Sequence, residues 1–135
     1  PSSSTREVVV VDASAATPAI TATYPTTTTL GTGTAHRIGD RVVWSSLAYF
    51  DVVAGTHGVI SPTPTGFTGF SGTTALGDDG YIYGVSGADD TKLTVINPAT
   101  GQWETGAIPG TGGRRGPAFA AAGKIYVPSG EPLSR

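Results

Sequence analysis

The side chains best suited to ligand chemistry are two basic pairs. Arg114 and Arg115 follow the glycines of GTGGRRGP (110–117), and His36 is followed by Arg37 in a short apolar segment. A guanidinium group can hold a carboxylate or sulfate through two parallel hydrogen bonds. If the neighbouring strands surround a channel, Arg114 and Arg115 are candidate ligand-binding residues at its mouth, and His36 and Arg37 are candidates on an inner strand. The alternative for the loop arginines is simple solvation.

Two aromatic residues lie outside the expected strands. Phe67 and Phe70 occur in TPTGFTGFSG (63–72), a segment typical of a loop. An exposed ring there could stack on a sugar or anchor a partner chain, so Phe67 and Phe70 are further candidate ligand-binding residues. The other aromatic residues fall mostly in expected strands, where core packing is the ordinary role.

The sequence favours no catalytic or metal centre. His36 and His57 are the only histidines, and neither belongs to a zinc-binding HxH or HExxH motif. Nucleophile elbows and phosphate-binding loops are absent. Asp78-Asp79 and Asp89-Asp90 lie near glycines, where aspartate is an ordinary turn residue. We therefore expect no catalytic residues, no bound metal and no cofactor, and we keep an enzyme as the alternative.

The composition indicates a single all-β domain over residues 1–135. Charged residues make up only 13% of the chain, whereas Gly (20) and Pro (10) are abundant and Thr is frequent. The net charge of −2 gives no basis for nucleic-acid binding, and no apolar run is long enough to span a membrane. Cysteine is absent. Few charges with many Ser and Thr would suit an extracellular or virion surface.

A repeated strand pattern predicts the architecture. Three segments start with Gly and a small residue and contain two apolar strands joined by a turn at Gly or Asp: 33–44, 72–84 and 116–130. Three pairs of strands ending in proline alternate with them: 7–25, 49–64 and 92–109. Four short strands in about 40 to 45 residues are typical of a β-propeller blade.

We therefore predict about three four-stranded, propeller-type blades, with repeat units of approximately 7–44, 49–84 and 92–130. A β-sandwich, which spaces its turns similarly, is the alternative. Within this pattern the four valines of REVVVVDAS (6–14) suggest a strand buried on both faces. Gly101 is expected to adopt a positive φ, and Trp103 is expected to pack between neighbouring blades rather than bind a ligand.

The motifs resemble those of known propellers. NPATGQWETGAIP (97–109) followed by GKIYVPSG (123–130) is similar to the kelch family and to quinoprotein-type propellers. Kelch repeats carry a Gly-Gly pair after the second strand, whereas this chain has Ser45-Ser46, Ser86-Gly87 and Ser129-Gly130. TTALGDDGYIYGVSG (73–87) resembles hairpins of lactonase-like and streptogramin-lyase-like propellers. The resemblance implies a propeller blade, and its lactonase-like or lyase-like form implies an enzyme with a divalent metal in the channel.

Three blades are too few for a ring, because propellers close with roughly 4–8. The strand pattern starts within a blade and ends within another, so we expect either a fragment of a longer propeller or a half-ring closed by a second chain. The favoured function is a non-enzymatic binding or structural module that recognises protein or glycan through its loop faces, with a cell or virion surface as its expected location. The alternative is the metal-dependent, propeller-type enzyme.

Overall fold

The computed structural model describes residues 6–14, 16–27, 30–31, 33–108 and 118–128, and in these residues the chain is all-β. Its strands are β1 (Arg6–Asp12), β2 (Ala19–Thr26), β3 (Ala35–Ile38), β4 (Arg41–Trp44), β5 (Ala48–Asp51), β6 (Thr56–Val59), β7 (Ala75–Leu76), β8 (Ile82–Val85), β9 (Lys92–Ile96), β10 (Trp103–Ala107), β11 (Phe119–Ala121) and β12 (Lys124–Tyr126). The all-β prediction is therefore confirmed.

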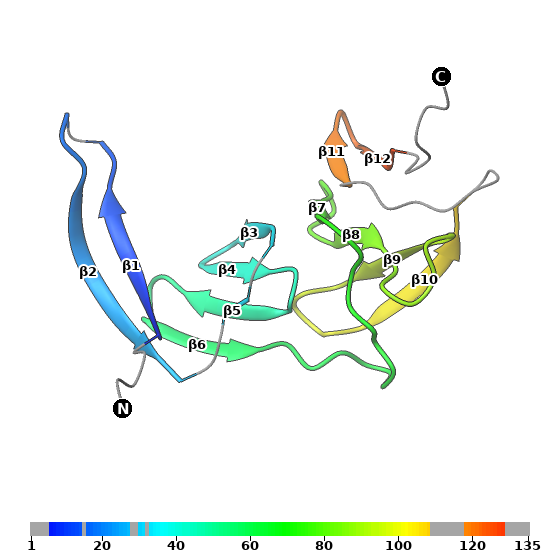
Figure 1. The fold of residues 1–135 in the computed structure, drawn as a ribbon, viewed down its shortest axis with the longest axis horizontal. Helices are drawn as coiled ribbons and strands as arrows, with labels where there is room; N and C mark the ends of the chain where they lie inside the picture. Colours follow the sequence, from blue (N-terminus) through cyan, green and yellow to red (C-terminus); the bar gives the residue numbers. More distant parts are fainter. Residues whose placement is uncertain (1–5, 15, 28–29, 32, 109–117, 129–135) are drawn as a thin grey trace, which may run out of the picture.

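The strands form four antiparallel sheets in strict sequence order. Two sheets have four strands, β3-β4-β5-β6 and β7-β8-β9-β10, and two have only two, β1-β2 and β11-β12. Figure 1 shows the sheets following one another along the chain, with β1-β2 and β11-β12 at opposite ends and no closure into a ring. The β3-β6 sheet thus combines the second half of the repeat unit 7–44 with the first half of the unit 49–84. The β7-β10 sheet likewise combines the second half of the unit 49–84 with the first half of the unit 92–130.

The same turn joins the strands of three hairpins. The side-chain oxygen of Asp51 accepts hydrogen bonds from the backbone N–H groups of Val53 and Ala54 at 3.1 and 2.8 Å, between β5 and β6. Asn97 Oδ1 accepts one from Ala99 N at 2.9 Å between β9 and β10. Asp12 Oδ1 accepts one from Ser14 N at 2.8 Å between β1 and β2. Asp and Asn stabilise turns in this way, and Asp79 makes the same contact with Tyr81 N between β7 and β8.

The hydrophobic core joins the two four-stranded sheets. Val43 from β4 clusters with Ile82 from β8 and Ile96 from β9, and Leu47 and Ile60 from the connections complete the cluster. Trp103 packs against this cluster, and its ring lies 5.4 Å from that of Phe67. Trp103 therefore packs at the contact between two sheets, as the sequence suggested, and its indole N–H donates to the Pro64 carbonyl oxygen at 2.6 Å.

The expectation that the valine run is buried on both faces is wrong for the described chain. Val9 is 42% exposed and Val11 is 50% exposed, and Ile20 opposite Val11 is 68% exposed. One face of β1-β2 contacts the next sheet, where the Tyr24 and Phe50 rings lie 5.2 Å apart. The other face, which carries Val9, Val11 and Ile20, stays largely exposed in the described chain.

Candidate functional site

The first strands of two successive four-stranded sheets, β3 and β7, and of the β11-β12 sheet line a common hollow. A hydrogen bond from Thr74 N to Thr34 Oγ1 (3.2 Å) links the starts of β3 and β7, and one from Ala118 N to the Thr73 carbonyl oxygen (3.1 Å) links β11 to β7. The resulting inner-strand hollow measures about 470 Å³. Its lining combines hydroxyl groups, one imidazole and apolar side chains: Thr34, Thr73, Thr74, His36, Leu76 and Phe119.

His36 is the titratable group of the inner-strand hollow. It lies on β3 opposite Val43, and its Nε2 is 2.8 Å from Thr74 Oγ1. Partial burial disfavours the imidazolium and lowers the pKa of His36 below its usual 6.5, while hydrogen bonding to Thr74 offsets part of this shift. A neutral imidazole beside threonine hydroxyls can both donate and accept hydrogen bonds.

This environment predicts a titration. We expect the His36 imidazole to titrate below pH 6.5 in the folded protein, measured from its ring-proton chemical shifts. Because the folded state then binds a proton less readily than the unfolded chain, the contribution of His36 to stability is present above pH 6.5 and is lost as the pH falls through the folded-state pKa. A His36 resonance that titrates at or above pH 6.5 would contradict the burial.

Of the predicted arginines, the structure describes Arg37, and its side chain does not lie with that of His36. Arg37 follows His36 on β3, so its side chain points to the opposite face of the strand. It is exposed, and its Nε donates to the Gly39 carbonyl oxygen at 3.3 Å. Arg114 and Arg115 lie outside the described residues. Ligand binding by these three arginines therefore stays a prediction.

Phe67 and Phe70 lie in the connection between β6 and β7. Their rings meet edge to face at 5.3 Å, and both are half-buried against the core cluster. Phe70 also lies over Gly84 of β8, where an added Cβ would come within 2.5 Å of the ring. These contacts give both rings a packing role, and their binding of a sugar or partner stays a prediction.

The paired aspartates act in turns. Asp79 accepts hydrogen bonds from Tyr81 N at 3.0 Å and from the Tyr83 hydroxyl at 2.5 Å. The Tyr83 bond is the main reason that the pKa of Asp79 is lowered, and it raises the pKa of Tyr83 to about 12. Asp89 accepts from Thr91 N and Oγ1, which lowers its pKa. Among the described residues, no three His, Cys, Asp or Glu side chains come together as metal ligands.

Sequence reasoning missed a second hollow, on β9 and β10. This β9–β10 hollow has a volume of about 370 Å³, and its lining includes Tyr81, Val95, Asn97, Gln102 and Glu104. Val95 pairs with Tyr83 on one side and Glu104 on the other, so these residues share one face of the sheet. Ile82 and Ile96 lie on the opposite face, which packs on β3-β6, while Trp103, which pairs with Ile96, also lines the hollow. The available signal in the sequence was strand alternation: successive side chains of a strand point to opposite faces, so Val95 must lie on the face opposite to that of Ile96.

Comparisons of this chain with models of protein families, with curated proteins and with solved structures found no match. Within the described residues, no helix is present that is long and apolar enough to cross a membrane.

Proposed function

We propose that this chain is a non-enzymatic recognition module built from propeller-type blades, and that it binds a glycan in the inner-strand hollow. The observation that carries the proposal is the lining of that hollow, where threonine hydroxyls and the His36 imidazole lie beside the half-exposed ring of Phe119. Hydroxyl and imidazole groups exchange hydrogen bonds with sugar hydroxyls, and an aromatic face offers apolar contact to a sugar ring.

The blade architecture is supported by the order of the strands. Both four-stranded sheets are simple meanders, and β3, β7 and β11 lie on the same side of successive sheets. A β-sandwich would instead use Greek-key connections between its sheets.

Recognition of a protein loop by the same face is the second form of this proposal, and the uncharged lining makes a glycan the better fit. A location outside the cell or on a virion surface agrees with the low content of charged residues. The alternative is an enzyme with a divalent metal. Among the described residues, no three His, Cys, Asp or Glu side chains lie together to bind such a metal, so we do not develop a mechanism for it.

The test is binding of the purified protein to a panel of immobilised neutral glycans. We expect at least one glycan to bind, and His36→Gln to weaken that binding about threefold to tenfold, the usual value of one hydrogen bond. His57→Gln is the matched control, because His57 lies on β6 and bonds Thr27 rather than the inner-strand hollow. Equal loss in both variants, or no binding by the unmodified protein, would contradict the proposal.

A further inference from the structure

The two-stranded sheets correspond to complementary halves of a four-stranded sheet. In β3-β6 and β7-β10, the turn stabilised by Asp51 or Asn97 joins the third and fourth strands. β2 leads into β3, the first strand of a four-stranded sheet, as β6 leads into β7, so β1-β2 corresponds to the third and fourth strands, and Asp12 accepts from Ser14 N in its connection as Asn97 accepts from Ala99 N. β11-β12, which follows the β7-β10 sheet and contacts β7 through β11, corresponds to the first and second.

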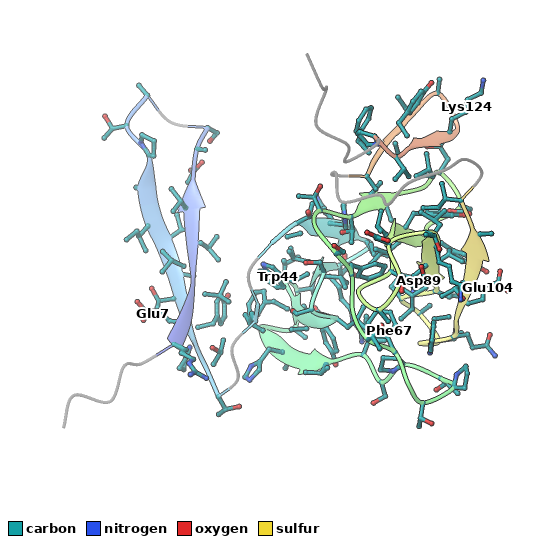
Figure 2. The ribbon with its side chains drawn as sticks, turned by 45° about the vertical axis from the view of Figure 1, so that its right-hand side comes forward. Glu7, Trp44, Phe67, Asp89, Glu104 and Lys124 are labelled. Carbon is teal, nitrogen blue, oxygen red and sulfur yellow. The ribbon has the colours of Figure 1, made fainter. Side chains whose placement is uncertain are left out.

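We propose that β12 of one copy of this chain pairs antiparallel with β1 of a second copy, so that two chains complete each other's two-stranded sheets. This inference rests on the blade architecture proposed above. The two edges cannot meet within one chain as folded, because β1 and β12 lie at opposite ends of the molecule (Figure 1). Figure 2 likewise shows Glu7 of β1 and Lys124 of β12 far apart.

The register of the new pair follows from the complete sheets. Between β4 and β5, Arg41 pairs with Asp51, the turn residue, and Val42 pairs with Phe50. Between β8 and β9, Ile82 pairs with Ile96, the residue before Asn97. Lys124 corresponds to Arg41, because Ala121 pairs with Lys124 across β11-β12 as Ile38 pairs with Arg41 across β3-β4. The equivalent register therefore places Lys124 opposite Asp12 of the second copy and Ile125 opposite Val11.

The charges on the two edges are complementary in this register. Arg41 Nε lies 3.8 Å from Asp51 Oδ2 in the complete sheet. Lys124 and Asp12 occupy the corresponding positions, and both are exposed in the single chain. Opposite charges directly across a pair of strands are favourable, and like charges are unfavourable. The Arg41–Asp51 ion pair of the β4-β5 register thus has a counterpart between the two copies.

The same arrangement would bury Val9 and Val11, which are exposed in the single chain, against the second copy. Val11 corresponds to Phe50 and Ile96, which are 2% and 0% exposed, whereas Val11 itself is 50% exposed. Ile96 belongs to the core cluster with Val43 of the preceding sheet, and Tyr49 of that sheet packs against the same cluster. The counterparts of Val43 and Tyr49 in β7-β10 are Tyr83 and Val95.

Val95 lines the β9–β10 hollow, and Tyr83 lies beside it on the same face. The apolar face of β1-β2, with Val9, Val11 and Ile20, would therefore cover this hollow in the second copy. Two copies would supply four complete and two shared sheets, which lies within the roughly 4–8 blades that closed propellers use.

The first test is the mass of the protein in solution, by light scattering on a sizing column over a range of concentrations. We expect twice the mass of one chain. Val11→Lys should give the mass of one chain, because it would bury an unpaired charge. Val53→Lys is the control, because Val53 is 75% exposed in the β5-β6 turn. A single-chain mass for the folded, unmodified protein, or an open polymer, would overturn the closed pair.

The second test examines the register. The chain has no cysteine, so Asp12→Cys with Lys124→Cys introduces one defined pair, directly opposite across the proposed strands. Oxidation should link two chains. The control pair Val11→Cys with Lys124→Cys places the two thiols on opposite faces and should not link. Equal linking of both pairs would overturn the register.

The same measurements separate this inference from the proposed function. A single-chain protein that still binds glycans through His36 would overturn the pairing alone. A double-mass protein that binds no glycan would overturn glycan recognition alone.

Discussion

Replacing Ile96 with alanine is expected to lower the free energy of unfolding by about 2–5 kcal/mol, the usual cost of removing a large buried aliphatic side chain. Ile96 and its cross-strand neighbour Ile82 are both 0% exposed, and they meet Val43 of the neighbouring sheet. The substitution would leave a cavity at the contact that holds the two four-stranded sheets together, and the surrounding strands can relax only in part.

Urea unfolding followed by circular dichroism measures this effect, at one fixed protein concentration because association would itself add stability. Val53→Ala is the control, since its exposed side chain should change stability by no more than about 0.5 kcal/mol. Similar losses in the two variants would mean that Ile96 is not at the centre of the core.

Gly101→Ala is the second substitution with a large expected effect. Gly101 adopts a φ of +78° in the β9-β10 turn, a conformation that costs other residues about 1–2 kcal/mol. A Cβ at this position would also overlap the backbone carbonyl oxygen of Ser61. Neither segment can move freely, because Thr63 N donates to the Gly101 carbonyl oxygen at 2.8 Å. Crowding of this kind typically adds a further 1–3 kcal/mol.

Gly80→Ala separates these two costs. Gly80 has a similar φ of +82°, but an added Cβ would meet no atom within 4 Å. Thermal and urea unfolding of the two variants should therefore show Gly101→Ala to be less stable than Gly80→Ala. Equal stability of the two variants would mean that Ser61, in the connection after β6, does not crowd a side chain at position 101.

The local features of this fold could be predicted from the sequence, because they depend on neighbouring residues. The runs around Val8–Val11 and Lys92–Ile96 predicted strands, and both are strands. The positive φ expected at Gly101 is confirmed. Regular alternation of strands and turns was enough to give the all-β class and the hairpins, because these rest on propensity and on turn chemistry.

Features that depend on distant contacts could not be predicted in the same way. Four valines have the composition of a fully buried strand, yet their exposure depends on whether another sheet covers them. The core contacts of Phe67 and Phe70 depend on where the connection crosses β7-β10. At the candidate site, the strand that carries His36 was predicted, whereas its partner Thr74 lies 38 residues away, just before β7 of another sheet.

The strictly sequential pairing of strands also has a kinetic consequence. In β3-β6 and β7-β10 every strand pairs with its neighbours along the chain, so few long loops must close before the first stabilising contacts form. Folding rates rise as the average sequence separation of contacts falls. Each sheet can therefore form as a local unit as soon as its hairpins have emerged from the ribosome, and joining to a neighbouring sheet can follow later.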